Sequence, residues 1–260
     1  MEDHAAVDTS VRLVEAAGQF KAKGFVNGVL RSITRTPAEE WLRKLEPEDP
    51  LAAVAFRHAH PVWIAESIRA ALGSRDDELE AALEADSARP VVHLVARPGE
   101  MSAEELALVT GGEEGRYSPY AVYLPEGDPG QLQPVREGLA AVQDEGSQVI
   151  ARAVVDVPVE DDQRRWLDLC AGPGGKAALM GALAAIDGAV VDAVEVSPHR
   201  AELIRKTVRD LPVRVHTADG RRSGLEPGYD RALVDAPCSG LGALRRRPEA
   251  RWTCLLYTSP

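Results

Sequence analysis

The residues best suited to chemistry form one short run, Asp235-Ala236-Pro237-Cys238-Ser239-Gly240. A carboxylate, a rigid proline and a thiol this close together indicate covalent catalysis, because a cysteine thiolate is a strong nucleophile. The alternative is that Cys238 packs as a small buried hydrophobic residue, which is how most free cysteines behave. Pro237 and Gly240 place Cys238 in a loop, and this favours the chemical role.

A glycine-rich run, Cys170-Ala171-Gly172-Pro173-Gly174-Gly175-Lys176, lies between an apolar segment and a helical one. Glycines allow the backbone to turn tightly and to approach a ligand, and the free N–H groups of a helix start favour a carboxylate or phosphate. The run lacks the third glycine of a dinucleotide-binding loop, and neither Ser nor Thr follows Lys176 as in a P-loop. It predicts a ligand-binding loop of another kind, with a simple connecting turn as the alternative.

Two further acids follow apolar runs in the same part of the chain. Glu195 lies 23 residues after Gly172, an offset at which an acid can accept both hydroxyl groups of a ribose. Asp219, followed by Gly220, suits the amino group of an adenine. Taken singly, Glu195 and Asp219 could each just as well be an acid that is merely exposed to solvent. Together with the glycine loop they predict a nucleoside ligand that carries a ribose and a charged tail.

Alternating strands and helices must position these residues. Apolar runs predict strands over 166–170, 189–196, 213–217 and 231–234, and helical spacing predicts helices over 176–186 and 199–211. This alternation is typical of parallel βαβ units, so we expect an α/β fold with a Rossmann-like doubly wound sheet. Ligands of such sheets bind beyond the carboxyl ends of the strands, where the four candidate segments stand.

The chain before residue 148 has a different pattern. Helical spacing and helix-starting prolines predict helices over 11–17 and 25–33, and from Pro37 and Pro61. An acidic stretch over 76–86 predicts a solvated helix. Further on, β-rich runs predict strands over 91–95 and 117–124 with a helix over 104–109 between them. We therefore divide the chain into a helical segment (1–60), a small α/β subdomain (61–147), and the doubly wound region (148–252).

Length and composition limit the class of protein to which the chain can belong. A chain of 260 residues, 45% hydrophobic and 27% charged, is globular and long enough for two domains. No apolar run approaches the length of a membrane span, and the N-terminus has no secretion signal. The three cysteines have no paired metal-ligand spacing, so we expect no metal and a reducing, cytoplasmic setting. The oligomeric state is left open.

The charge distribution bears on nucleic acid as a partner. Residues 1–150 carry a net charge of −12 and residues 151–260 one of +1, and an acidic total counts against phosphate binding. Two basic groups offset this total, Lys21, Lys23, Arg31 and Arg35 near the N-terminus and Arg245, Arg246, Arg247 and Arg251 beside Trp252. Arginines beside an aromatic residue suit phosphates and stacked bases, although such clusters are more often only solvated surface.

Taken together, these motifs are recognisable. The glycine loop with the preceding Asp168-Leu169, the run Asp219-Gly220-Arg221, and the run 235–240 resemble the RsmB/NOP/Sun family of RNA cytosine-C5 methyltransferases. Residues 23–31 resemble the NusB-like helical domain of RsmB proteins, and residues 142–148 resemble the segment that enters their catalytic domain. The resemblance covers the chain to about Trp252. It implies a methyltransferase domain over 148–252 and RNA as partner, with small-subunit ribosomal RNA favoured by the NusB-like segment.

The resemblance also implies a cofactor and residue roles. The cofactor would be S-adenosylmethionine, with Cys170, Ala171, Gly172, Pro173, Gly174, Gly175 and Lys176 along its methionine side. Glu195, where the family more often has Asp, would hold the ribose and Asp219 the adenine. Asp235 would lie where the cofactor meets the target cytosine, and Arg200 would assist near the ribose. In this family Cys238 would help to release the product.

The attacking cysteine is where the chain departs from the family. The family takes this thiol from a later Thr-Cys pair at the end of a further strand. Thr253-Cys254 follows Cys238 by only 16 residues, which leaves no room for a helix and a strand. We interpret residues 253–260 as a non-native tail and the chain as a fragment shortened at both ends. We expect such a fragment to keep most cofactor contacts without methylating RNA.

Two alternatives belong to other classes of function. One is a non-catalytic adaptor that binds RNA on a methyltransferase scaffold, and Asp235 with Cys238 argue against it for the intact protein. The other is an amino-group methyltransferase. That class would have Asn or Asp, then Pro-Pro and an aromatic residue, at the fourth strand end. Ala236 and Cys238 do not match that pattern.

Overall fold

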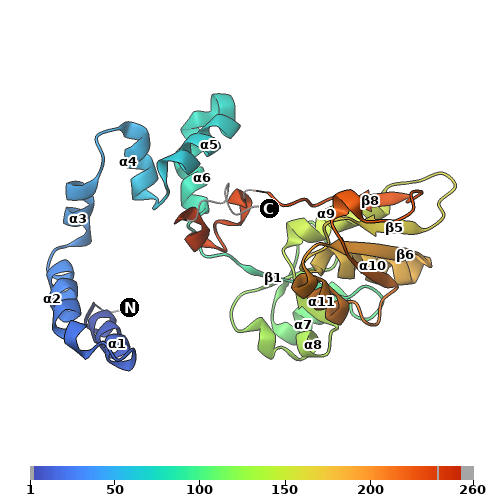
Figure 1. Cartoon of the computed structure of the whole chain (residues 1–260), viewed down its shortest axis with the longest axis horizontal. Helices are drawn as coiled ribbons and strands as arrows, with labels where there is room; N and C mark the ends of the chain where they lie inside the picture. Colours follow the sequence, from blue (N-terminus) through green and yellow to red (C-terminus); the bar gives the residue numbers. More distant parts are fainter. Residues whose placement is uncertain (1–2, 239, 253–260) are drawn as a thin grey trace. The chain divides into compact units, whose positions relative to one another are not determined.

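The computed structural model describes residues 3–238 and 240–252, and Figure 1 shows its elements in chain order. The chain forms two compact units. Of the described residues, the first unit contains 3–88 and 241–252, and the second contains 89–238 and 240. The division at residues 60, 147 and 252 stays a prediction.

The first unit is helical. Its helices are α1 (Asp3–Ala16), α2 (Lys23–Thr34), α3 (Ala38–Leu45), α4 (Pro50–Arg57), α5 (Val62–Leu72) and α6 (Leu79–Ala85). Sequence patterns did not predict α4, whose first turn is capped by the Asp49 side chain on the Ala52 amide at 2.8 Å. The solvated helix expected over 76–86 is partly wrong, because Leu79 and Leu83 of α6 are buried against Ala55 and Ala65.

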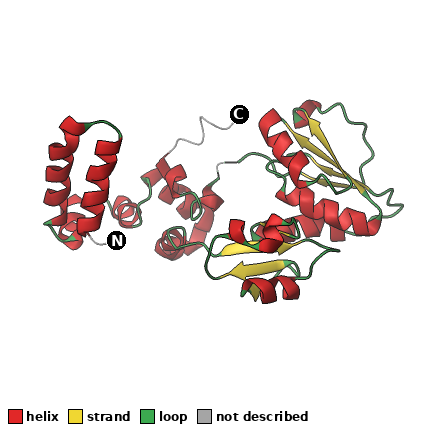
Figure 2. Ribbon diagram, turned by 90° about the horizontal axis from the view of Figure 1, so that it is seen from below, coloured by secondary structure: helices red, strands yellow, loops and turns green. Residues whose placement is uncertain are grey.

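The second unit contains two sheets, drawn as separate yellow ribbons in Figure 2. The first is antiparallel with the order β2-β3-β1-β4 and comprises β1 (Val92–Ala96), β2 (Glu113–Glu114), β3 (Ala121–Leu124) and β4 (Ala140–Val142). Helices α7 (Ala103–Thr110) and α8 (Gln133–Arg136) belong to this sheet's region. Ser102 begins α7 with a reciprocal capping box to Glu105, which is why the short helix starts there.

The second sheet is parallel, as predicted. It has the order β7-β6-β5-β8 and comprises β5 (Arg165–Asp168), β6 (Val190–Glu195), β7 (Val213–Thr217) and β8 (Arg231–Leu233). Helix α10 (Gly175–Asp187) joins β5 to β6, and α11 (Pro198–Thr207) joins β6 to β7. The chain runs outward from β5 through β6 to β7 and then returns to the other side of β5, so the Rossmann-like doubly wound fold is confirmed. This reversal puts the topological switch point between β5 and β8.

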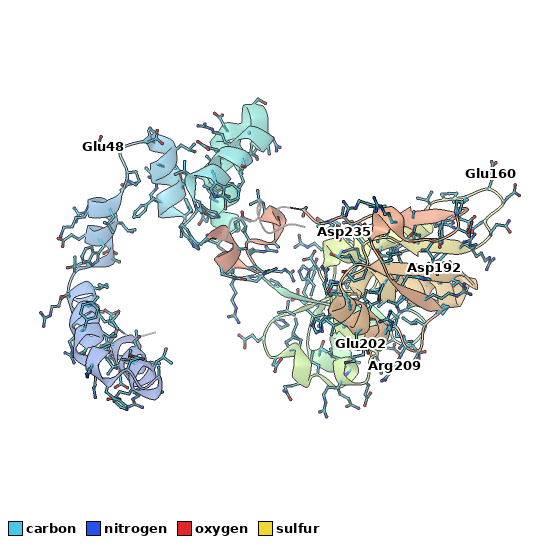
Figure 3. The ribbon with its side chains drawn as sticks, viewed as in Figure 1. Glu48, Glu160, Asp192, Glu202, Arg209 and Asp235 are labelled. Atoms are coloured by element: carbon cyan, nitrogen blue, oxygen red, sulfur yellow. The ribbon has the colours of Figure 1, made fainter. Side chains whose placement is uncertain are left out.

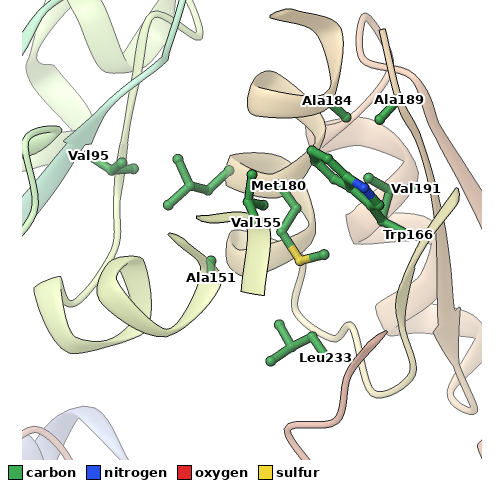
Figure 4. Close-up of a cluster of buried hydrophobic side chains, with 10 residues drawn as sticks. Val95, Ala151, Val155, Trp166, Met180, Ala184, Ala189, Val191 and Leu233 are labelled. Carbon is green, nitrogen blue, oxygen red and sulfur yellow. The ribbon is translucent and has the colours of Figure 1, made fainter. Parts of the chain in front are cut away.

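One core holds the parallel sheet against the preceding region. Helix α9 (Glu145–Asp156), which sequence patterns did not predict, packs against α10. Figure 4 shows Val155 of α9 beside Met180 of α10, and Ala151 and Trp166 of β5 belong to the same buried cluster. Burial of Trp166 and its neighbours stabilises this packing by about 25 cal/mol for each Å² of apolar surface that is removed from water, and this holds β5 in place. This core therefore holds in place the strand that leads into the glycine loop.

Candidate active site

The four parallel strands bring the predicted residues to one edge. Because β5, β6, β7 and β8 are parallel, their carboxyl ends meet at the same side of the sheet. Asp168 ends β5 and Glu195 ends β6, while Asp219 lies two residues beyond β7 and Asp235 two residues beyond β8.

Gly172 and Glu195 are in direct contact. A Cβ atom on Gly172 would overlap the Glu195 carboxylate and approach the Arg200 guanidinium nitrogens to 2.7 Å. Arg200 donates from Nη2 to the Gly172 carbonyl at 2.6 Å and lies 3.5 Å from Glu195 Oε2. The glycine is therefore required because a side chain and a guanidinium occupy the space beside its backbone.

Glu195 is buried rather than exposed. Its side chain is 5% exposed, and its Oε1 accepts a hydrogen bond from the Ser197 amide at 2.8 Å. The Glu195 carbonyl accepts from the Ala218 amide, which ties β6 to the segment leading to Asp219. A carboxylate held by an amide and an arginine has a fixed orientation, as the recognition of two adjacent hydroxyl groups requires.

The remaining loop residues lie between β5 and α10. Ala171 is buried and its amide donates to the Val194 carbonyl at 2.9 Å, whereas Pro173 is exposed. Gly174 is the residue before α10 and has a φ of +114°, a conformation that favours glycine. Gly175 then opens the 13-residue helix, so its first free amides face the loop.

Asp168 is an acid of the glycine-loop motif to which the sequence patterns gave no role. Its side chain is fully buried, and neither carboxylate oxygen has a hydrogen-bond partner in the described part of the chain. Burial raises the pKa of Asp168 to about 6, against the opposing effect of the Lys176 charge. The sequence feature that could have singled out Asp168 is its position at the end of an apolar strand, directly before a glycine loop.

Lys176 links the glycine loop to the fourth strand end. Its Nζ lies 2.6 Å from Asp235 Oδ2, and the Asp235 side chain is 54% exposed. Figure 3 labels Asp235 in the loop after β8. The pair spans the switch point between β5 and β8. Sequence spacing could not predict this ion pair, because 59 residues separate its partners along the chain.

The two described cysteines differ. Cys170 is half-buried, and burial together with the negative charge of Asp168 raises the pKa of its thiol. A raised pKa lowers its thiolate fraction at neutral pH, so Cys170 fits a packing or lining role better than attack. Cys238 is exposed. Ser239, Thr253 and Cys254, which belong to the sequence motifs, lie outside the described residues.

Asp219 is held by an arginine to which the sequence patterns assigned no contact. Arg221 donates to Asp219 from Nη2 at 2.6 Å and from Nε at 3.0 Å, and this bonding lowers the pKa of Asp219 to about 2. A Cβ atom on Gly220 would lie 3.1 Å from Leu169 Cγ, so this turn packs close to the segment after β5. The structure thus brings Asp219 to the common edge as a partly exposed, ion-paired acid.

Comparisons with known proteins agree with this geometry. The family model described as 16S rRNA methyltransferase RsmB/F matches residues 153–254, and that of the NusB family matches residues 1–35. The chain belongs to the RsmB/NOP/Sun family. The match of the RsmB/F model includes the glycine loop and all four acids of the edge.

Relatives of this RsmB/NOP/Sun chain cover nearly all of it. A protein of Mycobacterium tuberculosis named "Putative methyltransferase" is 56% identical over 97% of this chain and 56% of its own length. Ribosomal RNA small subunit methyltransferase B of Cronobacter sakazakii is 33% identical over 96% of this chain and 57% of its own length. The chain thus spans a little more than half the length of these curated relatives.

Solved structures share the fold of this RsmB/NOP/Sun chain. The crystal structure titled PH0851 matches with a TM-score of 0.76 at 20% identity, over 93% of this chain and 54% of that one. NSun6 from Pyrococcus horikoshii, solved with SFG, matches with a TM-score of 0.60 at 16% identity, over 69% of this chain and 71% of that one.

The described residues contain neither a membrane-spanning helix nor a cluster of metal-ligating side chains. None of their helices is long and apolar enough to cross a bilayer. Nor does that part of the chain hold three or more His, Cys, Asp or Glu side chains grouped as metal ligands.

Proposed function

We propose that this protein takes part in S-adenosylmethionine-dependent methylation of carbon 5 of a cytosine in RNA, with small-subunit ribosomal RNA as substrate and the cytoplasm as its setting. The observation that carries the proposal is the single strand edge that joins Gly172, Glu195 and the Lys176–Asp235 pair. Membership of the RsmB/NOP/Sun family supplies the reaction class, and relatives named as ribosomal RNA methyltransferases supply the substrate class.

The residues of the edge fit S-adenosylmethionine. Gly172 lets the Glu195 and Arg200 side chains pack against the loop backbone, Glu195 presents a buried, oriented carboxylate to a ribose, and Asp219 lies where an adenine amino group would be held. Residues Cys170 to Lys176 would border the methionine tail, whose carboxylate suits the free amides at the start of α10. The neighbour NSun6 was solved with SFG, an analogue of this cofactor, which supports the fit. When bound, the cofactor supplies an electrophilic methyl group.

The target base would lie beside Asp235. Carbon 5 of cytosine is a weak nucleophile until a thiolate adds to carbon 6 and makes carbon 5 enamine-like. A carboxylic acid that donates its proton to nitrogen 3 stabilises the negative charge that develops on the ring, which is the role we give to Asp235. Carbon 5 would then take the methyl group that the cofactor supplies and lose its proton to a base, and the bond between carbon 6 and the enzyme sulfur would break to release the thiolate. In the structure Asp235 is engaged by Lys176, so the incoming base must share or replace that contact.

The two candidate thiols have different roles in this proposal. Cys238 follows Asp235 by three residues and is exposed, and we propose that it helps to expel the product. The attacking thiol would come from a later Thr-Cys pair of the whole protein. On this account the 260-residue chain binds cofactor without carrying out the reaction.

The test incubates the chain with unmodified small-subunit ribosomal RNA and S-adenosylmethionine, followed by nucleoside mass spectrometry. We expect cofactor binding by calorimetry and no 5-methylcytidine. Formation of 5-methylcytidine that survives Cys254→Ala and disappears with Cys238→Ala would overturn the role given to Cys238. RNA binding without any cofactor heat would favour the non-catalytic adaptor, and a methylated amino group would favour the other class of methyltransferase.

A further inference from the structure

A cavity of about 320 Å³ is lined in part by Gly175 of the glycine loop and does not include Glu195. Its walls come from β1, β4, α10 and the end of α11, all within the second unit. None of the four acids of the strand edge lines it. Small or apolar residues form most of the wall, among them Ala96, Ala140, Ala178 and Ala182. Its volume lies at the lower end of the range of small-molecule sites, about 300–1,000 Å³.

Gln143 gives this cavity a specific polar group. Its side chain is only 7% exposed, and neither the amide oxygen nor the amide nitrogen has a hydrogen-bond partner in the part of the chain that the structure describes. The amide lies against the glycine loop, since a Cβ atom on Gly175 would be 3.6 Å from Gln143 Nε2. Both residues line the cavity. A buried amide with both functions unpaired is costly, so it gains from any ligand that offers a donor beside an acceptor.

Cationic side chains also line this cavity. Arg97 and Lys206 line it, and neither side chain has an ion pair among residues 3–238 and 240–252. Arg209, labelled beyond α11 in Figure 3, is already paired with Asp210 at 3.0 Å. Arg97 and Lys206 are therefore the groups available to an anion such as a phosphate.

We propose that this cavity binds an adenine nucleotide, with the base edge on the Gln143 amide and the phosphate on Arg97 and Lys206. Adenine presents an amino donor beside a ring-nitrogen acceptor, the pattern to which a glutamine amide binds in bidentate fashion. Because the Gln143 amide is sealed from solvent, the proposal requires this side chain to turn toward the cavity when the base binds. This cavity shares Gly175 with the loop that would border the methionine tail of the cofactor, but it contains none of the four acids of the strand edge and does not depend on the proposed methyl transfer.

The test titrates AMP into the full chain in the presence of saturating S-adenosylmethionine, which occupies the adenine position at the strand edge. We expect AMP to bind, and ribose 5-phosphate to bind at least about tenfold more weakly because it lacks the base edge. A short oligoadenylate that competes with AMP would identify RNA as the source of the nucleotide. Its failure to compete would identify the free nucleotide. Absence of AMP binding up to about 1 mM, or equal binding of ribose 5-phosphate, would overturn the proposal.

Two variants locate the binding. Gln143→Leu keeps the side-chain bulk without the amide and should weaken AMP binding about tenfold, and Lys206→Ala should weaken it severalfold with a smaller salt dependence. The matched controls are Gln131→Leu and Lys44→Ala, the latter on α3, and neither residue lines the cavity. Equal losses in variants and controls would overturn the proposal. If Gln143→Leu does not fold, the comparison of AMP with ribose 5-phosphate on the unaltered chain still decides it.

Discussion

The inner and outer strands of the parallel sheet end in acids of two kinds. Asp168 of β5 and Glu195 of β6 are buried, and their positions are set by the strands and by backbone contacts of the glycine loop. Asp219 beyond β7 and Asp235 beyond β8 are 38% and 54% exposed, and each is paired with one cationic side chain. The inner acids are therefore oriented by the fold, whereas the outer acids are held by ion pairs that a ligand can displace.

For Glu195 and Asp235, this difference matches the two tasks of the proposed site. A cofactor that must bind in one orientation needs a rigid partner, and Glu195 has that rigidity. A target base that arrives and leaves needs a partner that can exchange contacts, and exposed ion pairs contribute only about 0–1 kcal/mol to stability. The following predictions test whether the two pairs of acids differ in this way.

The largest effect is expected from Gly172→Ala. The added Cβ would displace the Glu195 carboxylate and the Arg200 guanidinium from the inner edge. Losing the oriented hydrogen bonds to a ribose should weaken S-adenosylmethionine binding by more than about a hundredfold in calorimetry. Gly24→Ala in α2 is the matched control, because nothing lies within 4 Å of a Cβ there. Unchanged cofactor affinity in Gly172→Ala would contradict the contact between the loop and Glu195.

Asp168→Asn should change stability with a defined pH dependence. Because the folded-state pKa of about 6 is above the usual value of 3.8, the folded chain binds more protons than the unfolded chain between these values. Stability should thus fall as pH rises from about 4 to 6. The variant should be more stable than the unaltered chain at pH 7.5, by at most about 3 kcal/mol, and show no gain near pH 4.

Urea unfolding at several pH values measures this effect. Asp156→Asn on the surface of α9 serves as control and should change stability by less than about 0.5 kcal/mol at each pH. A variant that loses stability at pH 7.5 would mean that the Asp168 carboxylate has a stabilising partner.

Much of this edge could be predicted from the sequence, for a local reason. Strand ends and glycine turns are encoded by consecutive residues, so the parallel sheet, the loop and the positions of Glu195 and Asp235 followed from alternation and spacing. Helix α6 shows the limit of local patterning. Its acidic residues predicted solvation, yet Leu79 and Leu83, four residues apart, bury one face.

The contacts that tune the site could not be predicted in this way. The Lys176–Asp235 ion pair depends on segments brought together by the pairing of β5 with β8, which are distant in sequence. The pairing of Asp219 with Arg221 is local, but it depends on a rotamer of an exposed arginine. Sequence patterns predicted which acids follow the strand ends. They did not predict which of these acids are buried and which form ion pairs.

A small effect is expected from Arg221→Ala on the outer edge. The variant frees Asp219 from its ion pair, so S-adenosylmethionine affinity should rise no more than about threefold if the adenine amino group competes for this carboxylate. Arg222→Ala, at the neighbouring residue, is the control and should leave the affinity unchanged. A large loss of affinity in Arg221→Ala would show that the arginine, and not Asp219, contacts the cofactor.

Calorimetric titration of S-adenosylmethionine into the 260-residue chain, compared with Glu195→Ala, tests the central claim most directly. Glu202→Ala is the matched control, an exposed acid on α11 that is labelled in Figure 3. We predict that the unaltered chain and Glu202→Ala bind with the same affinity and that Glu195→Ala binds at least about tenfold more weakly. Absence of binding to the unaltered chain, or equal affinity in all three proteins, would contradict a cofactor site at the carboxyl edge of the parallel sheet.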